Sequence, residues 1–505
     1  MHVKTLAAAC AFACAGFASQ ASAQAIGPFD TPNLTIYLAG ASAPDNFLES
    51  IATGIFDAGF IRYQDDGGTP SVFTDDGRSY RAFFGRVKND ATIPAALRGQ
   101  TVLFVKRSKG GSVWGVNPVA RAERIGTLNL TAGTCVLNSS IYRCVEKGID
   151  PGLAGYLNPS NAGVVPDIGV SDVEPALFKA PYNVEFGQSA LTATEVARLD
   201  VKPANVLMMG IVATNAVPAT TTIGRTAYGS MLSGSYQDWS QIDPSIASGN
   251  TQVVVCRRVQ GSGTQTSYNW FFNNFPCQGA FSGVVAPRRM VDDSASGITG
   301  GNGTQGNPFT IDPMAGYTVV ENSSSGNVRD CLTRAQTNQP HTFRGDDGNW
   351  YTIQFNNSGD PFRAIGVLST DSFSSANPDG NGWSFRPLDG AGVYNINTQA
   401  FASGPGTGVA PSKQNLIDGK YDFAVELTLQ YRRVAVTNEF GDNVAALSGL
   451  KKTFADFFIA RVGSPAFNTS NATAALPPTY DPFSTANVAK GTRFGNTCSP
   501  LQLLY

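Results

Sequence analysis

The chain has 505 residues, of which 36 are basic and 38 are acidic, so its formal net charge is only −2. This balance excludes a broadly basic surface for nucleic acid, and a chain of this length can bury two or more hydrophobic cores. Its two histidines are His2 and His341. Such scarcity argues against histidine-based catalytic triads, multi-histidine zinc sites and phosphorelay chemistry, and we expect no metal and no cofactor.

The first 23 residues predict a secretory signal peptide. Lys4 supplies the positive charge, Leu6 to Phe17 form a short apolar core, and Ala21-Ser22-Ala23 is a small-residue cleavage site. The apolar core is too short to span a bilayer, and no later run approaches 18 apolar residues. We therefore expect a secreted, soluble chain that lies in the periplasm or outside the cell.

After the signal, apolar runs alternate with helical patterns along the chain. This alternation predicts an α/β fold with parallel sheets. We expect a helix after Ser42, with one apolar face, and a longer amphipathic helix from about Leu447 that ends near Gly463. The expected strands are Leu34–Gly40, Thr101–Val105, Val206–Thr214 and Val253–Cys256.

One turn combines several features of an anion site. The strand Val253–Cys256 leads into Arg257-Arg258, and Gly261-Ser-Gly-Thr264 then precedes a predicted helix. Free N–H groups and the dipole of a helix N-terminus favour an anion, and the fork of Arg258 matches a tetrahedral oxyanion. The turn is not a Walker A loop, because no Gly-Lys-Ser/Thr closes it. Taken alone, a flexible turn with a Ser/Thr cap explains it more simply.

Three other strand-to-turn segments carry polar groups: Gly40–Pro44 with Ser42, Ser108–Ser112, and Ile168–Pro175 with Asp172. Each alone is explained as a helix cap, an ordinary loop or an Asx turn. Together they offer hydrogen-bond donors and one carboxylate acceptor. A buried carboxylate repels a fully ionised anion but accepts a hydrogen bond from one that still carries a proton, which favours phosphate over sulfate.

The ordered set of motifs resembles the periplasmic phosphate-binding proteins of ABC importers, in the type II periplasmic binding protein-like superfamily, with long insertions. The motifs run in family order over most of the chain: Leu38-Ala-Gly-Ala-Ser-Ala-Pro44, Ser108-Lys-Gly-Gly111, Gly169-Val-Ser-Asp172, Ser230 to Trp239, Arg257-Arg-Val-Gln-Gly-Ser-Gly-Thr264, Ala364-Ile-Gly-Val-Leu-Ser369 and Asp418-Gly-Lys-Tyr421. One departure is Gln260, which stands where the family has an acidic residue after the arginines.

The resemblance implies an α/β fold of two doubly wound lobes, with a hinge and a ligand cleft between them. Lobe one would comprise residues 24–189 and 373–505, and lobe two residues 190–372. Ser112 is an alternative to Ser108. The ligand-binding residues that the resemblance implies are Ser42, Ala43 through its backbone, Ser108, Asp172, Arg258, Ser262, Gly263 and Thr264.

Three functions follow as hypotheses. The resemblance implies a secreted, non-enzymatic solute-binding protein for phosphate or a similar tetrahedral oxyanion, with an ABC permease as its partner. Gly/Asn-rich insertions motivate the alternative, an extracellular or cell-surface interaction protein that reuses the fold. A phosphatase-like enzyme is the third, and the scarcity of histidine argues against its usual metal centres.

Six cysteines lie beyond the signal, and an even number in an exported chain predicts disulfides, with 15 connectivities for six cysteines. Short spacing favours Cys135–Cys144 and Cys256–Cys277, which leaves Cys331–Cys498. Cys10 and Cys14 lie within the signal at no plausible cleavage position, which disfavours a lipid anchor.

Overall fold

A computed structural model describes residues 25–67, 79–185, 188–277, 290–345, 347–372 and 382–505. The predicted signal peptide, with Cys10 and Cys14, lies outside the described residues. Within those ranges no helix is both long enough and apolar enough to cross a membrane.

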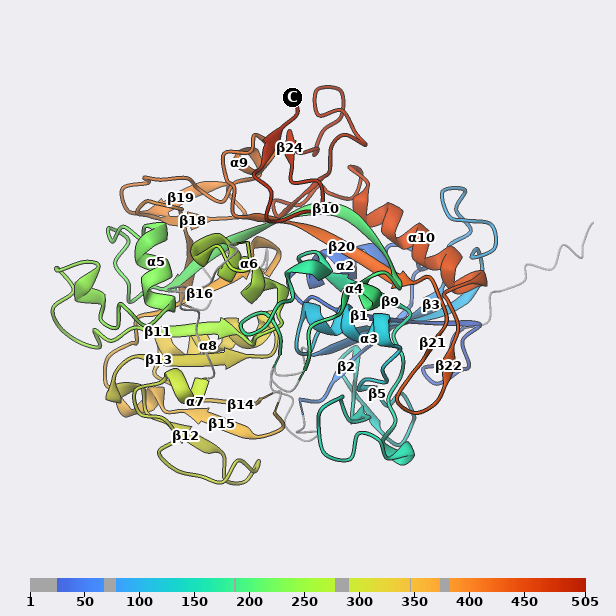
Figure 1. Cartoon of the computed structure of the whole chain (residues 1–505), viewed down its shortest axis with the longest axis horizontal. Coiled ribbons are helices and arrows are strands. Elements are labelled where there is room, and N and C mark those ends of the chain that lie inside the picture. Colours follow the sequence, from blue (N-terminus) through green and yellow to red (C-terminus); the bar gives the residue numbers. More distant parts are fainter. Residues whose placement is uncertain (1–24, 68–78, 186–187, 278–289, 346, 373–381) are drawn as a thin grey trace, which may run out of the picture.

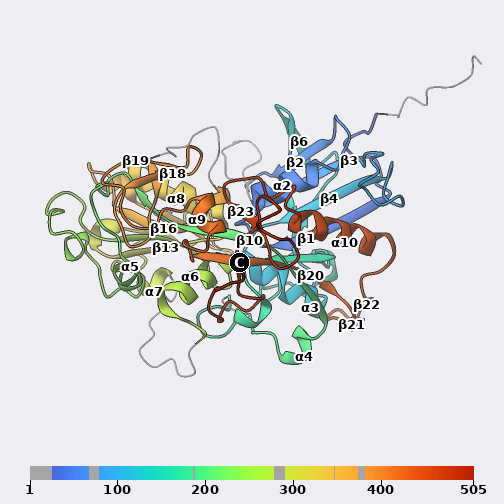
Figure 2. The same ribbon diagram turned by 90° about the horizontal axis from the view of Figure 1, so that it is seen from above.

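Two groups of strands and helices are joined by two long strands, β10 (Leu199–Thr214) and β20 (Ala424–Arg432), as Figures 1 and 2 show. The first part of β10 pairs with β20 through Met208, and Met209 to Ala213 pair with β16. One strand therefore belongs to the sheet of both groups, which we call lobe one and lobe two. The predicted α/β class and two-lobed architecture are confirmed.

In the described part of lobe one, seven strands follow β20 along the main path of the large sheet. Strand β1 pairs in parallel with both β4 and β9, so the carboxyl ends of these three strands meet at one edge of the sheet. In spatial order after β20 the strands are β9 (Ile168–Ser171), β1 (Leu34–Gly40), β4 (Thr101–Arg107), β3 (Tyr80–Arg86), β2 (Ile61–Asp65), β7 (Ile141–Cys144) and β6 (Cys135–Asn138).

Lobe two repeats the arrangement on a smaller scale. Strand β11 pairs in parallel with β13 and β16, and β17 pairs with the end of β10. The predicted lobe limits remain a prediction, and the pairing of β17 favours a later end for lobe two than residue 372. The strands are β11 (Val254–Arg258), β13 (Thr318–Asn322), β16 (Ala364–Ser369), β17 (Trp383–Arg386), β18 (Val393–Asn395) and β19 (Ala400–Ser403).

Helices cover the sheets and exclude water from the cores. In lobe one, α2 (Asp45–Thr53) and α10 (Gly449–Gly463) pack on the sheet, and their Leu48, Phe454 and Phe458 are 2% exposed or less. The predicted amphipathic helix that ends near Gly463 is therefore confirmed. In lobe two, α5 (Arg225–Leu232), α6 (Gly263–Asn273) and α8 (Ser325–Thr337) also pack on the sheet. Strand β10 contributes buried side chains to two of the hydrophobic cores.

Shorter elements complete the described chain. They are η1 (Ser112–Gly115), α3 (Asn117–Arg121), β5 (Thr127–Leu128), β8 (Glu146–Lys147), η2 (Pro159–Asn161), η3 (Pro175–Leu177), α4 (Ala193–Val196), η4 (Trp239–Gln241), α7 (Met290–Asp293), β12 (Phe309–Ile311), η5 (Pro313–Ala315), β14 (His341–Arg344), β15 (Trp350–Ile353), η6 (Phe355–Asn357), η7 (Thr370–Ser372), α9 (Lys413–Ile417), β21 (Val436–Thr437), β22 (Asn443–Val444), β23 (Thr473–Ala475), β24 (Gly491–Thr492) and β25 (Gln502–Leu503).

The described residues form three disulfides, and only one of the three predicted pairs is correct. Cys135–Cys144 closes the β6–β7 hairpin as expected. Cys256 pairs with Cys331, because β11 and α8 pack against each other within lobe two. Cys277 pairs with Cys498, which joins the chain after α6 to the C-terminal segment 221 residues away. Spacing in sequence misleads for the last two pairs because tertiary packing decides which sulfurs meet.

Candidate functional site

The predicted binding turns leave the carboxyl ends of parallel strands in both lobes. Ser42 follows β1, Ser108 follows β4 and Asp172 follows β9 directly, so the order of strands in lobe one brings the three turns to one edge. In lobe two, Arg258 ends β11 and the turn to α6 follows it, while α8 begins shortly after β13. Sites in open α/β sheets lie at this edge, and the two lobes present it to each other.

The turn before α6 packs directly on lobe one. Gly261 has φ +85°, a left-handed conformation that favours glycine, and its carbonyl accepts a 2.9 Å bond from the Val113 N–H of lobe one. A Cβ atom on Gly263 would lie 2.2 Å from Ser112 Oγ and 2.7 Å from Asp172 Cβ. Glycine is therefore required here for contact between the lobes.

Asp172 lies at the centre of this contact, with 1% of its surface exposed. Its Oδ2 accepts a 3.1 Å bond from Thr264 Oγ1, and its N–H donates to Ser112 Oγ at 3.2 Å. Burial raises the pKa of the Asp172 carboxyl to about 6, although the nearby Arg258 guanidinium and the Thr264 hydroxyl act to lower it. The group therefore exchanges a proton close to neutral pH.

Two buried polar atoms in this region have no hydrogen-bond partner. One is Asp172 Oδ1, an acceptor, and the other is Ser262 Oγ, which can donate. Ser262 is the N-cap residue of α6, yet its side chain does not cap the helix. Unpartnered buried polar atoms are costly and rare in folded proteins, so this pair indicates a place where a polar ligand can bind.

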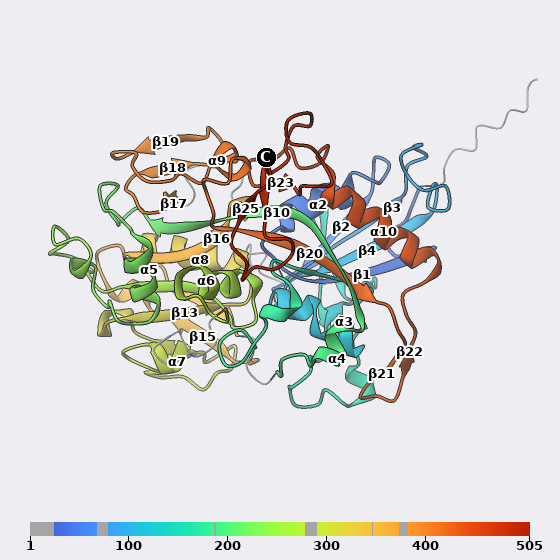
Figure 3. The ribbon, with the colours of Figure 1, turned by 45° about the horizontal axis from the view of Figure 1, so that its top comes forward.

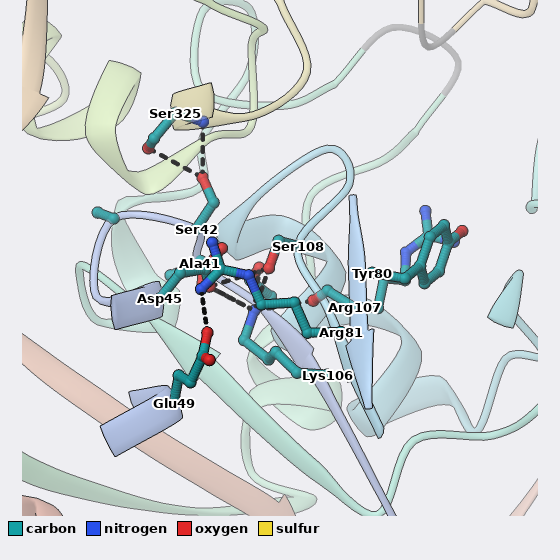
Figure 4. Close-up of polar contacts among 12 residues, drawn as sticks. Ala41, Ser42, Asp45, Glu49, Tyr80, Arg81, Lys106, Arg107, Ser108 and Ser325 are labelled. Carbon is teal, nitrogen blue, oxygen red and sulfur yellow. Dashed lines mark hydrogen bonds and ion pairs between the residues drawn. The ribbon is translucent and has the colours of Figure 1, made fainter. Parts of the chain in front are cut away.

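Arg258 joins the lobes on the other side of the contact. The guanidinium is 1% exposed, and Nη1 donates to Ser42 Oγ at 2.7 Å. Nε and Nη2 donate to the carbonyls of Asn322 and Ser323, which end and follow β13. Ser42 Oγ also accepts from the Ser325 N–H at 3.1 Å, at the N-terminus of α8 (Figure 4). The predicted cation of lobe two thus contacts the predicted serine of lobe one.

Ser108 does not join this cluster. Its hydroxyl donates to Asp45 Oδ1 at 2.9 Å and accepts from Lys106 Nζ at the same distance, as Figure 4 shows. Ser112 lies against Asp172 instead, because Gly110 and Gly111 adopt φ of +76° and +89° and turn the chain back toward β9. Of the two alternatives in this turn, Ser112 is the one that the structure brings to Asp172.

The remaining predicted positions lie in the same interlobe region. Ala43 is buried, and its carbonyl accepts a 2.5 Å bond from Ser369 Oγ of lobe two. Sequence reasoning missed Ser325. A local signal was available, since Ser324 follows a β-branched strand and caps α8 through its hydroxyl. Sequence reasoning also missed Lys106, a buried amine 3.3 Å from Asp45 that also bonds the Gly40 and Ala41 carbonyls.

A carboxylate of lobe two also binds the N-terminus of a lobe-one helix. Asp371 Oδ2 accepts from the N–H groups of Asn46 and Phe47, both at 3.0 Å, in the first turn of α2. Burial raises the pKa of Asp371 to about 7, with the neighbouring Asp45 carboxylate acting in the same direction. The cavity between Ser42 and Asp371 measures about 10 Å³, close to the space that one water needs.

We expect Asp371→Asn to change how stability depends on pH. The folded-state pKa lies above the ordinary value of an aspartate, so ionisation of Asp371 opposes folding. The protonated Asp371 carboxyl makes its full contribution to stability below about pH 4. This contribution is lost as the pH rises through about 7, by on the order of 3–4 kcal/mol. Asparagine does not titrate. The free energy of unfolding of the variant should therefore rise relative to wild type between pH 4 and 8, as urea titrations would show, and a constant difference would contradict the assignment.

Neither a protein-family model nor a curated protein matches the chain. Solved structures do align with it over most of its length. A putative phosphate ABC transporter substrate-binding protein from Clostridium perfringens, with bound phosphate, is 12% identical, and the alignment covers 84% of this chain and 92% of that chain at a TM-score of 0.37.

Two further solved structures align with the chain at similar identity and coverage. An ABC-type phosphate transport receptor from Vibrio cholerae is 12% identical, with 84% and 93% coverage and a TM-score of 0.32. The high-affinity periplasmic phosphate-binding protein PfluDING, bound with phosphate, is 14% identical, with 88% and 91% coverage and a TM-score of 0.39. These similarities are distant, so we base the function on the side chains of this chain.

Proposed function

We propose that this protein binds phosphate, or a similar tetrahedral oxyanion, between its two lobes. The observation that carries the proposal is the pair of buried, unpartnered atoms Asp172 Oδ1 and Ser262 Oγ, one an acceptor and the other a donor. They lie where the first turn of α6 and Arg258 supply further N–H groups. A tetrahedral anion that carries one proton matches such a set, because it offers several acceptors and one donor.

Each group would act by its charge and hydrogen-bonding capacity. The ionised Asp172 accepts the proton of monohydrogen phosphate and repels an anion that has no proton to donate. Ser262, Thr264 and the first-turn amides of α6 donate to the anionic oxygens, and Arg258 balances their charge. Because Arg258 now bonds Ser42 and Thr264 bonds Asp172, entry of the anion requires the lobes to part and these bonds to be exchanged.

The predicted signal peptide supports a secreted protein, located in the periplasm or outside the cell, and service to an ABC permease is the finer part of the proposal. Binding without chemistry is sufficient for that role, so we propose no catalytic residue. Among the described residues, no group of three His, Cys, Asp or Glu side chains is placed to hold a metal ion.

Titration calorimetry of the purified full chain tests the proposal. We expect phosphate to bind with a Kd in the micromolar range or below, and sulfate to bind far more weakly at pH 8. An absence of both heat and thermal stabilisation with phosphate, arsenate, sulfate and molybdate would overturn it.

Ser262→Ala gives a sharper test of the binding residues. We expect phosphate affinity to fall about tenfold, the value of one hydrogen bond to a charged group. Stability of the unliganded protein should not fall, because the Ser262 hydroxyl has no partner to lose. Ser267→Ala is the matched control, since its hydroxyl is equally buried in α6 but donates to the Thr264 carbonyl of its own helix. Equal losses of affinity in both variants would contradict a specific role for Ser262.

One observation favours the alternative, an extracellular interaction protein. Nε, Nη1 and Nη2 of Arg258 each already donate to an oxygen of the protein, so the lobes hold each other without an anion. If no oxyanion binds, the closed lobes would act as a rigid scaffold, and the protein should then be found at the cell surface or in the culture supernatant irrespective of phosphate supply.

A further inference from the structure

One buried amine lies behind the lobe-one half of the proposed anion site. Lys106 is on β4, and 3% of its surface is exposed. Its Nζ donates to the carbonyls of Gly40 and Ala41 at 3.2 and 2.9 Å, and to the carbonyl of Arg107 at 2.9 Å. Nζ also donates to Ser108 Oγ at 2.9 Å (Figure 4). A single side chain therefore bonds both the turn that follows β1 and the turn that follows β4.

These bonds begin where the pairing of β1 with β4 ends. The two strands pair in parallel as far as Ala39 of β1. Gly40 and Ala41, which follow, are both buried, and a buried carbonyl without a donor destabilises the folded state. Lys106 supplies a donor to both carbonyls. The path of the chain from the end of β1 to Ser42 therefore depends on this amine.

A carboxylate holds the amine in place. Asp45 begins α2, and its Oδ1 lies 3.3 Å from Lys106 Nζ and accepts a 2.9 Å bond from the Ser108 hydroxyl. Asp45 is only 9% exposed, so water screens this ion pair little. Burial lowers the pKa of the Lys106 amine, whereas Asp45 and, less strongly, Asp172 act to raise it. Lys106, Asp45 and Ser108 thus form one buried, hydrogen-bonded unit beside the binding turns.

The turn that Lys106 bonds also carries a contact between the lobes. Ser42 Oγ accepts a 2.7 Å bond from Arg258 Nη1 and a 3.1 Å bond from the Ser325 N–H, and both donors belong to lobe two. Hydrogen bonds weaken steeply as their atoms move apart or out of line. A small displacement of the β1–α2 turn would therefore separate Ser42 from both donors.

We propose that Lys106 is a positioning residue, which holds the β1–α2 turn so that Ser42 meets Arg258 and the anion between the lobes. An ammonium has three protons, and oxygens of lobe one accept them, so Lys106 acts through Ser42 and not by contact with the anion. The effect on anion affinity rests on the proposed function. The effect on the contact between the lobes does not.

Lys106→Met removes the donors and keeps the length of the side chain. We expect calorimetry of the full chain to show a loss of phosphate affinity of about tenfold or more. Lys413→Met is the matched control, because this half-buried amine of α9 also donates to three backbone carbonyls, in the segment 468–473. The control should lower thermal stability and leave phosphate affinity unchanged. Equal losses of affinity in the two variants would overturn the proposal.

A double-mutant cycle with Ser42→Ala separates positioning from a general loss of structure. Once the Ser42 hydroxyl is absent, its placement no longer matters, so Lys106→Met should then cost less than about threefold in phosphate affinity. Losses that add in full would show that Lys106 does not act through Ser42.

Lys106→Arg carries the same test if Lys106→Met does not fold. It keeps the positive charge, but a planar guanidinium does not reproduce the compact ammonium, so phosphate affinity should fall several-fold. Unchanged affinity in Lys106→Arg would mean that charge alone is sufficient, which contradicts a positioning role.

Hydrogen exchange of the unliganded protein, followed by mass spectrometry, tests the positioning role without any anion. The Ser325 N–H bonds Ser42 Oγ, so the peptide that contains Ser325 should exchange faster in Lys106→Met than in wild type or Lys413→Met. Unchanged exchange would overturn the proposal. Faster exchange in Lys106→Met, together with no binding of phosphate to wild type, would support the positioning role and refute the proposed function alone.

Discussion

Asp172→Asn should reverse the selectivity of the protein between phosphate and sulfate. The ionised carboxylate accepts the proton of phosphate and repels sulfate, whereas an asparagine amide can donate to either anion. A hydrogen bond to a charged group contributes about 1.5–3 kcal/mol, so phosphate affinity should fall about 10- to 100-fold while sulfate affinity rises by a similar factor. Calorimetric titration of both anions at pH 8 measures the ratio.

The pH dependence of sulfate binding gives a second readout of the same group. Because the pKa of Asp172 is about 6, the wild-type carboxyl becomes a hydrogen-bond donor only as the pH falls below that value. Sulfate affinity should therefore increase as the pH falls below about 6 in wild type and stay flat in Asp172→Asn. The control is Asp200→Asn, at a carboxylate paired with Lys202 at the start of β10. Parallel pH profiles of sulfate affinity in wild type and Asp172→Asn would contradict the assignment of Asp172 to the anion site.

Loss of the Cys277–Cys498 disulfide should give the largest change in stability. The C-terminal segment contacts both lobes: the Thr497 N–H and hydroxyl bond Glu174, which follows β9, while the disulfide fixes Cys498 to the chain after α6 (Figure 3). Its loop spans 221 residues, and long loops gain most from closure. We expect Cys277→Ser with Cys498→Ser to lower the free energy of unfolding by about 2–5 kcal/mol in non-reducing urea titrations.

The hairpin disulfide provides a matched control. Cys135 and Cys144 are only nine residues apart, and their strands already pair as β6 and β7. Replacing both by serine should cost about 2–3 kcal/mol less than the long-range pair, on the entropy of loop closure. Equal losses would mean that the C-terminal segment does not hold α6 to lobe one.

Looser closure in the Cys277/Cys498 variant should also weaken phosphate binding, because the two halves of the site lie on different lobes.

Local patterns predicted most of the secondary structure near the site. An apolar, β-branched run followed by a glycine turn and an N-cap residue is a strong local signal. It located the strand at Val253–Cys256, which the structure extends to Arg258, and the helix near Thr264, which starts at Gly263. The position of Asp172 after a short apolar strand was equally readable. These signals depend on neighbours within a few residues, so the sequence carries them without knowledge of the fold.

Only the fold could show which of several similar side chains lies at the candidate site. Ser108 and Ser112 flank the same glycine pair, and only the positive φ angles of Gly110 and Gly111 direct Ser112 to Asp172 and Ser108 to Asp45. Ser325 lies 283 residues from its partner Ser42, a separation that no local pattern can bridge.

By itself, the sequence determined the α/β class, and it singled out Ser42, Asp172, Arg258 and Thr264, whose role in binding stays a prediction. Only the tertiary structure decided which cysteines pair, that Arg258 bonds Ser42 across the lobes, and that Gln260 borders an interlobe cavity. The physical reason is the same in each case. Strand and turn preferences act over a few residues, whereas disulfides, interlobe hydrogen bonds and cavities depend on how β10 and β20 place two distant sheet edges against each other.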